Sequence, residues 1–377
     1  MASHQQPMAN QNKDLFYSLF KALCVVVALY LFLVGINGMS SAIKHMGSEV
    51  ADSIFTTTSN PIIALFIGVF STVLFQSSST TTSLIVGLVS SGTLSLSGAV
   101  PMIMGANIGT TVTNTIVSVG HINQGKEFKR AFAASTVHDF FNILAVLILF
   151  PLEMAFHGIQ RTAEWCGNAI FGKIENVDVL QAKSPIKLAV KSGSKFIEQF
   201  TFDNNVVFLV VSVLITFLML YSIVKLLKSL VLEKIEAFFD QYIFKTALRA
   251  ICFGVILTIM VQSSSITTSL VVPLAGAGVL TLRKIFPFTL GANIGTTITA
   301  LLAALTGTVS ALVAAGSHLF FNIFGILIIY GIKPLREIPL KCADLISDYA
   351  VKNKLVPLFY LLIMFVALPL AIILLSQ

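Results

Sequence analysis

The feature that most constrains the fold is a duplicated polar motif in an otherwise apolar sequence. From Gln76 the chain reads QSSSTTTSLIVGLVSSGTLSLSGAVPMIMGANIGTTVT, and from Gln262 it reads QSSSITTSLVVPLAGAGVLTLRKIFPFTLGANIGTTIT. The two stretches align without a gap, and a second related pair follows them, HDFFN at 138–142 and HLFFN at 318–322. Chance similarity between apolar sequences would match Leu and Val, but not QSSS and GANIGTT together. We therefore predict two copies of one structural unit.

Composition places these units in a membrane. Hydrophobic residues make up 56% of the chain and charged residues 11%, whereas a soluble domain is about one quarter charged. Apolar stretches repeatedly exceed about 18 residues, the length of a membrane-spanning helix. We expect an all-α polytopic membrane protein in a lipid bilayer. The net charge of +7 does not indicate nucleic-acid binding, because the basic residues lie between apolar segments, where they determine topology.

Each copy of the motif begins inside a pair of short apolar arms. Residues 61–75 are apolar, 76–83 are rich in hydroxyl groups, and the chain then becomes apolar again. Neither arm is long enough to span a bilayer. We therefore predict a re-entrant helical hairpin at 61–91 with QSSS at its tip, and a second one at 246–280.

The number of spans between the hairpins sets their relative orientation. Three spans are expected between them, at about 98–119, 128–156 and 205–230. Because three is odd, the second hairpin enters from the opposite face of the membrane. The two units are therefore predicted to be inverted repeats, as in many secondary transporters.

The distribution of basic residues supports this topology. With a cytoplasmic N-terminus, the predicted inner segments hold sixteen Lys and Arg residues, whereas the short outer loops hold only Lys44. Cytoplasmic loops carry such an excess of Lys and Arg. The predicted organisation is a polar N-terminal segment at 1–14, a transmembrane repeat at 15–156, an extracytoplasmic loop at 157–204, a second transmembrane repeat at 205–335 and a C-terminal transmembrane helix at 353–377.

The two hairpin tips are expected to meet near the midplane, where non-helical backbone must line a cavity or be buried in protein. The two GANIGTT stretches are expected to break their helices at the same depth. Broken helices offer N–H groups to anions and carbonyl groups to cations, and hydroxyl and amide side chains suit both. The candidate ligands outside QSSS are the amides of Asn107 and Asn293 for an oxyanion, and the hydroxyls of Thr110, Thr111, Thr296 and Thr297 for an alkali cation.

Neither QSSS nor GANIGTT contains a Lys or Arg. A bound oxyanion would therefore depend on co-bound cations for charge compensation, which is a physical route to coupled transport. The alternative is that these hydroxyls only bond the backbone four residues back or allow close helix packing. That alternative does not explain why the glutamine is duplicated with them.

Asp139 is the only acidic residue within 128–152. A carboxylate inside a membrane is unfavourable and often marks an ion or proton pathway. Alternatively, it pairs with His138 or lies at a helix end near water. Its counterpart in the second repeat is Leu319, so a site that uses the carboxylate would exist once.

The histidines and asparagines of HDFFN and HLFFN recur in both repeats. Duplication of His138 and His318 favours a shared structural role over a proton relay. Asn142 and Asn322 are expected to cap or cross-link neighbouring helices.

These motifs resemble those of the type II sodium–phosphate cotransporters. The resemblance rests on QSSS, on GANIGTT with VTNTIV at 112–117, and on RAFAASTVHDFFN at 130–142. It extends over about 55–156 and 205–335, which is most of the chain. It implies import of inorganic phosphate coupled to sodium entry by alternating access, with sodium as the co-transported ion and no other cofactor.

The resemblance also implies roles for individual residues. Gln262, Ser263, Thr296 and Thr299 fall where the family binds sodium, and Asp139 lies where electrogenic members carry an aspartate. The two QSSS tips resemble the family's phosphate site, which here comprises Gln76, Ser77, Ser78, Ser79, Gln262, Ser263, Ser264 and Ser265. The small size and plain loops indicate a bacterial inner membrane protein.

Other functions stay open at this point. The same architecture could carry another oxyanion, such as sulfate or a carboxylate. A gated ion channel also uses hairpins and polar pores, although inverted repeats favour a carrier. An ATP-driven pump is disfavoured because the chain has no GxxxxGK[ST] motif, and no catalytic constellation with suitable spacing indicates an enzyme.

Overall fold

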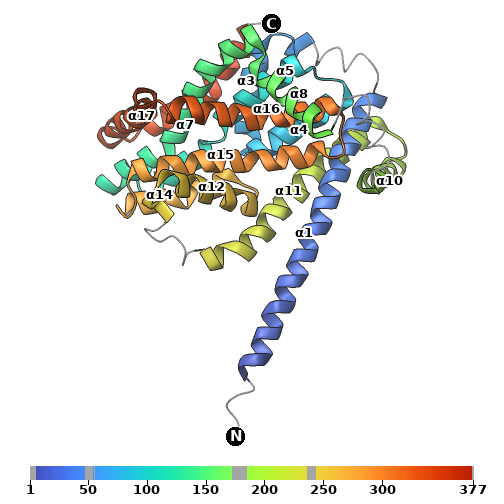
Figure 1. Ribbon diagram of the computed structural model, residues 1–377, viewed down its shortest axis with the longest axis horizontal. Helices are drawn as coiled ribbons and strands as arrows, with labels where there is room; N and C mark the ends of the chain where they lie inside the picture. The colour runs from blue at the N-terminus through green and yellow to red at the C-terminus, as the bar shows by residue number, and fades with distance from the viewer. Residues whose placement is uncertain (1–5, 47–53, 55, 172–184, 236–242, 376–377) are drawn as a thin grey trace.

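The computed structural model describes residues 6–46, 54, 56–171, 185–235 and 243–375 (Figure 1). Every regular element in this part of the chain is helical. All five predicted segments lie partly outside the described residues: the N-terminal segment by 1–5, the first repeat by 47–53 and 55, the extracytoplasmic loop by 172–184, the second repeat by 236–242, and the C-terminal helix by 376–377.

Six of the described helices are long and apolar enough to cross a membrane. They confirm the prediction of an all-helical, multi-pass integral membrane protein. The candidate spans are Leu19–His45, Lys126–Phe156, Asn205–Leu227, Leu282–Ala304, Val309–Tyr330 and Val356–Leu375.

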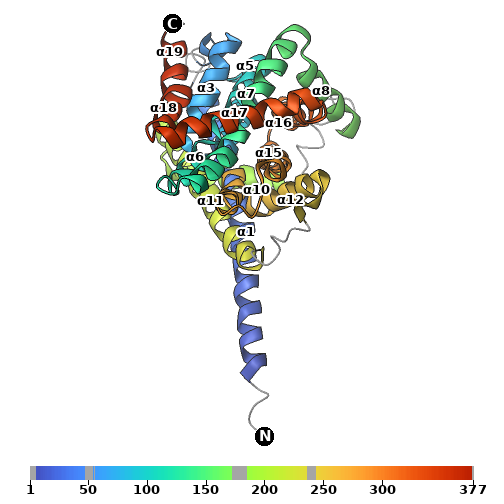
Figure 2. The ribbon, with the colours of Figure 1, turned by 90° about the vertical axis from the view of Figure 1, so that its left-hand side faces the viewer.

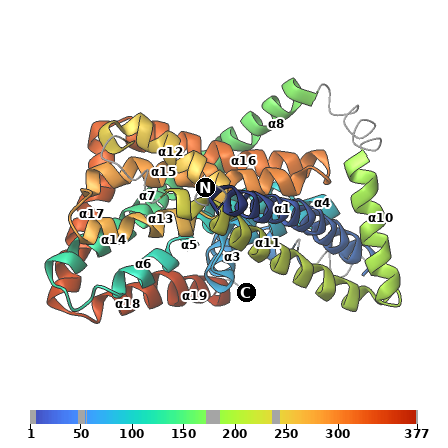
Figure 3. The same cartoon turned by 90° about the horizontal axis from the view of Figure 1, so that it is seen from below.

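The first span belongs to α1 (Gln6–His45), which projects from the helical bundle and carries the N-terminus at its far end (Figure 1). Its C-terminal half packs along α11 (Asn205–Ile235). A Cβ atom at Gly38 would lie only 2.5 Å from the Ser212 hydroxyl, so this helix pair depends on a small residue, as membrane helices often do. On its other side α1 contacts α10 (Pro185–Phe200), seen beside it in Figure 3.

The first duplicated motif forms two helices joined by a tight reversal, α3 (Pro61–Phe75) and α4 (Ser78–Ser91). Helix α3 begins at Pro61, where proline is favoured, and the Asn60 side chain caps it by accepting from the Ile62 N–H. The second motif forms α12 (Ala247–Val261), α13 (Ser264–Ser269) and α14 (Val271–Gly276). In both copies the glutamine of QSSS makes the reversal.

Each hairpin packs against the helix that carries GANIGTT, namely α5 (Leu96–Gly109) for the first and α15 (Leu282–Ala304) for the second. The contacts repeat position by position. A Cβ atom at Gly105 would overlap the Leu65 carbonyl oxygen, and one at Gly291 would overlap the Ile251 carbonyl oxygen. The glycines of GANIGTT therefore allow backbone-to-backbone contact in both halves.

The helix break predicted within GANIGTT occurs in one copy only. After Gly109 the first copy leaves the helix at Thr110 and Thr111 and resumes as α6 (Val112–Val119). The Ser265 hydroxyl donates to the Thr110 carbonyl at 3.2 Å and satisfies a carbonyl group that the break releases.

In the second copy the predicted break is wrong, because α15 is continuous through GANIGTT. The irregularity lies instead in the second hairpin arm, at Leu270 between α13 and α14. Pro273 follows it by three residues and has no N–H to donate to the preceding turn. The first hairpin has Gly87 at this position, and α4 is unbroken.

The remaining helices enclose the two motifs. They are α7 (Lys126–Phe156), α8 (Gly158–Phe171), α16 (Val309–Gly325), α17 (Lys333–Lys352), α18 (Val356–Leu362) and α19 (Leu368–Leu375), with a 3-10 turn at Ile243–Lys245 and π-helical turns at Ile326–Tyr330 and Ile363–Ala367. The C-terminal helices bring the end of the chain beside α3 (Figure 2).

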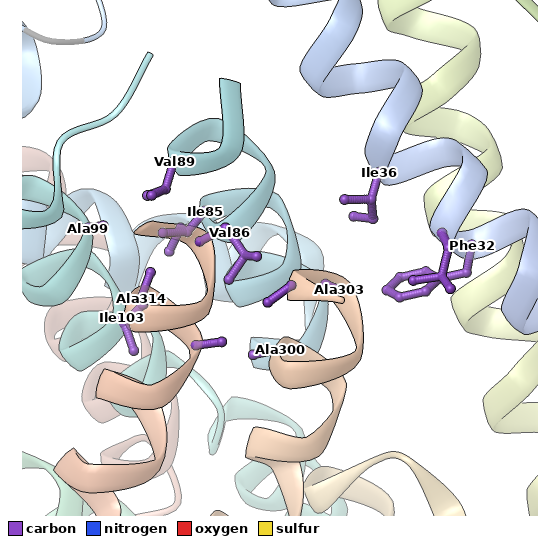
Figure 4. Close-up of a cluster of buried hydrophobic side chains, with 14 of the residues drawn as sticks. Phe32, Ile36, Ile85, Val86, Val89, Ala99, Ile103, Ala300, Ala303 and Ala314 are labelled. Atoms are coloured by element: carbon purple, nitrogen blue, oxygen red, sulfur yellow. The ribbon is translucent and has the colours of Figure 1, made fainter. Parts of the chain in front are cut away.

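The apolar core mixes side chains from both copies of the motif. In Figure 4 the apolar face of α4 lies against α5 of its own half and against α15 and α16 of the other. Alanines on α15 and α16 let these helices approach closely. The labelled side chains are Ile85, Val86, Val89, Ala99, Ile103, Ala300, Ala303 and Ala314, with Phe32 and Ile36 on α1. The two halves therefore form one interlocked structure.

Candidate functional site

The two hairpin tips line one cavity of about 400 Å³. Side chains of α6 and α11 complete its wall, where the rings of Phe75 and Phe217 meet edge to face at 4.9 Å between centroids. The lining residues are Phe75, Gln76, Ser77, Ser78, Ser79, Thr80, Thr113, Phe217, Leu220, Tyr221, Val224, Ser263, Ser264, Ser265 and Ile266. The structure thus brings together seven of the eight QSSS residues that the sequence predicts for phosphate, and none of the described lining side chains is charged.

Both tips have the same local geometry. Gln76 and Gln262 adopt left-handed backbone conformations with φ of 52° and 55°, so each reverses the chain within one residue. The next residue caps the following helix: the Ser77 hydroxyl accepts from the Thr80 N–H at 3.2 Å, and the Ser263 hydroxyl accepts from the Ile266 N–H at 3.3 Å. The first turns of α4 and α13, with N–H groups that have no acceptor within the helix, therefore line the cavity.

Three serine hydroxyls on these first turns are available to a ligand. Ser78, Ser79 and Ser264 make no side-chain hydrogen bond within the described part of the chain, whereas the Ser265 hydroxyl is held by Thr110. Helix N-termini favour negative charge, and free hydroxyls donate hydrogen bonds to oxyanions. The cavity is therefore suited to an anion without a basic side chain.

The tip glutamines connect the hairpins to the neighbouring helices. The Thr299 hydroxyl donates to Gln262 Oε1 at 2.8 Å, and in the first half the Thr113 hydroxyl donates to Gln76 Oε1 at 3.2 Å. The structure thus joins two of the predicted sodium ligands, Gln262 and Thr299. Thr113 was missed by the motif analysis, although its place opposite Thr299 in the repeat could have revealed it.

The Gln262–Thr299 pair borders a second, smaller cavity of about 100 Å³, whose other walls are apolar side chains of α1, α11 and α15. Thr296 lies nearly one turn before Thr299 on α15, and its hydroxyl donates to the Ala292 carbonyl at 3.0 Å. The hydroxyl oxygen of Thr296 keeps lone pairs that a cation can use. These oxygens are of the kind that bind sodium.

The other predicted threonines lie deeper. Thr110, Thr111 and Thr297 are buried; the first two donate to carbonyls of the preceding helix α5, and Thr297 donates to a carbonyl of α15. Such bonds are the usual state of a threonine in a helix. Their role as sodium ligands stays a prediction.

Asn107 and Asn293 do not line the cavity but belong to a buried polar cluster that links the two halves. His138 Nε2 lies 2.5 Å from Asn293 Oδ1, and His318 Nε2 lies 3.3 Å from Asn107 Oδ1. Each histidine thus bonds the asparagine of the other half, which favours the predicted structural role. The contact of both asparagines with phosphate stays a prediction.

The asparagines of HDFFN and HLFFN complete this cluster. Asn142 Nδ2 donates to the Asn107 carbonyl at 2.7 Å, and Asn322 Nδ2 donates to the Asn293 carbonyl at 3.4 Å. The Asn293 amide also donates to Asn142 Oδ1 at 2.8 Å. The prediction that Asn142 and Asn322 cross-link neighbouring helices is confirmed.

Asp139 lies apart from both tips. It is fully buried on α7, and its Oδ2 accepts a hydrogen bond from the Tyr360 hydroxyl of α18 at 2.9 Å. The neighbouring His138 bonds Asn293 instead, so the alternative of an Asp139–His138 pair is not observed. The carboxylate therefore faces the C-terminal helices.

Comparison with known proteins identifies the family. A family model described as Na+/Pi-cotransporter matches residues 31–172 and 217–333. The chain belongs to the Na+/Pi-cotransporter family. It is a family of transporters and not of enzymes, and the matched residues include both hairpins, both GANIGTT stretches and Asp139.

Relatives within the Na+/Pi-cotransporter family are similar along nearly the whole chain. Sodium-dependent phosphate transport protein 2B of Pongo abelii and that of Homo sapiens are each 33% identical over 95% of this chain, and transport protein 2A of Ovis aries is 34% identical over 93%. The chain spans about 65% of the length of the two 2B proteins. No solved structure gives a significant match.

Proposed function

We propose that this chain imports inorganic phosphate coupled to sodium entry. The observation that supports this most directly is that the two QSSS tips share a cavity without charged side chains among its described lining residues. Two helix N-termini and free serine hydroxyls converge there, which is a suitable environment for an oxyanion. The names of the relatives, all sodium-dependent phosphate transport proteins, give the substrate and the coupling ion.

The lack of basic side chains among the described lining residues gives a physical reason for the proposed coupling. An anion in a poorly solvated cavity is unfavourable unless compensating charge lies nearby. Sodium bound by Gln262, Ser263, Thr296 and Thr299 would supply positive charge beside the second tip. Phosphate and sodium would then stabilise each other's binding, which is the thermodynamic basis of coupling.

We also propose that the two halves are inverted repeats and that the hairpins are re-entrant. The duplicated glycine contacts and the duplicated left-handed glutamines support one shared unit. In this arrangement the cavity opens alternately to either side, the N-terminus is cytoplasmic, and the membrane is a bacterial inner membrane. Segments 1–14, 157–204 and 353–377 lie outside the repeats.

Transport is proposed to be electrogenic because of Asp139. A second cation at this carboxylate would add one positive charge to each cycle, and no equivalent exists at Leu319. The remaining predicted ligands keep their roles in this proposal: Asn107 and Asn293 would contact phosphate, and Thr110, Thr111 and Thr297 would bind sodium.

Uptake of labelled phosphate into proteoliposomes tests the proposal. Saturable uptake that requires an inward sodium gradient, fails with potassium and rises with an inside-negative potential is expected. Competition by unlabelled sulfate or a carboxylate would instead identify another oxyanion as the substrate. Flux that does not saturate would indicate a channel, and no uptake of any of these anions would contradict the proposal.

A further inference from the structure

Tyr360 lies in a part of the chain that the repeat and the family match do not include. It belongs to α18, whereas the residues matched by the family model end at 333. Its hydroxyl donates to Asp139 Oδ2 at 2.9 Å, and the two side chains are 8% and 0% exposed. A donor far away in sequence therefore reaches a fully buried acidic side chain of α7.

The second carboxylate oxygen of Asp139 is unsatisfied. Oδ1 is buried and has no hydrogen-bond partner within the described residues. A carboxylate with an unpaired oxygen inside a membrane protein is unfavourable unless a cation or a proton reaches it. With Oδ2 held by Tyr360, Oδ1 is the oxygen left for a ligand.

Aromatic packing fixes the position of the tyrosine hydroxyl. The centroid of its ring lies 6.5 Å from that of Phe132, 6.2 Å from that of Phe140 and 5.8 Å from that of Phe365. These side chains surround the ring, so it has little freedom to turn. Phenylalanine at this position would keep the packing and remove only the donor.

Neither Asp139 nor its hydrogen-bond donor Tyr360 is duplicated in the other half of the chain. Asp139 is replaced by Leu319 in the second repeat, and α18 follows the second repeat with no described equivalent after the first. Figure 3 shows α6 lying between α13 and α18, so the C-terminal segment reaches the broken helix beside the second tip.

We propose that Tyr360 is a positioning residue for a monovalent cation at Asp139. By holding Oδ2 it sets the rotation of the carboxylate and presents Oδ1 to the cation. The C-terminal helix thus takes part in ion coupling, although it lies outside the repeat. This inference rests on the proposed sodium-coupled function.

The test measures sodium binding by the purified full-length protein in detergent, without phosphate. The melting temperature is recorded against sodium concentration, with potassium at equal ionic strength as reference, since a ligand of the folded state raises it. The variants are Tyr360→Phe, Asp139→Asn and the double variant. Tyr330→Phe is the matched control, because Tyr330 packs in the same apolar cluster and contacts no carboxylate in a described interaction.

We expect Tyr360→Phe to raise the sodium concentration needed for the Asp139-dependent part of the shift about tenfold, the effect of losing one hydrogen bond to a charged group. Asp139→Asn should remove that part, the double variant should match Asp139→Asn, and Tyr330→Phe should match wild type. The inference is overturned if Tyr360→Phe matches wild type, or if wild type shows no sodium-specific shift in melting temperature. It is also overturned if Asp139→Asn responds to sodium like wild type, or if Tyr360→Phe has an equal effect in the Asp139→Asn background.

Phosphate uptake by the same proteins separates this inference from the proposed function. A wild-type protein that shows the sodium response but transports no phosphate would refute the proposed function and leave the role of Tyr360 standing. If wild type shows sodium-coupled phosphate uptake and Tyr360→Phe needs the same sodium concentration for it, the proposed function stands and the role of Tyr360 is refuted.

Discussion

At the scale of single residues, hydroxyl groups within one motif have different roles. Ser79 lies on the first turn of α4, lines the cavity and has a free hydroxyl. Thr82, only three residues later, donates to the Ser78 carbonyl at 2.8 Å. A Ser or Thr hydroxyl inside a helix usually bonds a backbone carbonyl three or four residues earlier. In the first turn those earlier residues precede the helix, so their carbonyls are not in place to accept the bond. Position relative to the helix start, and not residue type, therefore decides which hydroxyls can meet a ligand.

Ser79→Ala should weaken phosphate binding, because it removes one neutral hydrogen bond to the anion. That loss corresponds to about 1 kcal/mol, or roughly fivefold in the phosphate concentration at half-maximal uptake. Ser83→Ala is the matched control, since its hydroxyl is buried without a described partner and does not line the cavity. Equal effects of the two changes on phosphate affinity would contradict the assigned site.

Thr299→Val should raise the sodium concentration at half-maximal uptake severalfold, because it removes the donor that orients Gln262. The equivalent change in the first half, Thr113→Val, should affect sodium less, since the resemblance places a sodium ion beside the second tip. Uptake measured against sodium at saturating phosphate distinguishes the two. A larger sodium effect from Thr113→Val would place the cation at the first tip.

At the scale of helices, close backbone contact determines how each hairpin docks. Gly291 on α15 meets the Ile251 carbonyl of α12 without room for a side chain. Such contacts fix the depth of the tip relative to the helix that carries the threonines. The spacing of the glycines in the sequence indicates this packing, but not which carbonyl each glycine meets.

Gly291→Ala should push α12 away from α15 and destabilise the protein. Overpacking typically costs about 1–3 kcal/mol, and we expect a value near the upper end of that range. Gly158→Ala is a suitable control, because a Cβ at the start of α8 would meet no atom within 4 Å. Thermal unfolding in detergent should show a lower melting temperature for the first change only. An unchanged Gly291→Ala protein would mean that the helices adjust freely at this contact.

The sequence predicts the elements better than their irregularities. The alternation of apolar and hydroxyl-rich segments predicts two short helices on either side of each QSSS, and the first copy forms helices at Pro61–Phe75 and Ser78–Ser91. At the break, the Thr110 carbonyl accepts a hydrogen bond from the Ser265 hydroxyl of the other half. An identical GANIGTT stretch without such a donor stays helical, so the motif alone cannot determine the break.

At the scale of the whole molecule, the two halves hold each other in place. His138 and His318 each bond an asparagine of the opposite half, and the apolar core contains residues of both. The sequence repeat predicts that these residues have equivalent roles in the two halves. Which residue of the opposite half each one bonds can be seen only in the folded structure. The Asp139–Tyr360 contact is beyond sequence analysis for the same reason, because Tyr360 lies in a segment without a repeated counterpart.

The central claim is that phosphate binds between the two QSSS tips and requires sodium there. The most direct test replaces the four native cysteines by alanine, introduces Ser78→Cys or Ser264→Cys, and measures the rate of thiol modification by a small polar reagent. Sodium and phosphate together should slow modification at both positions, whereas phosphate with potassium should not. Unchanged modification rates under conditions where the protein takes up phosphate would contradict the claim.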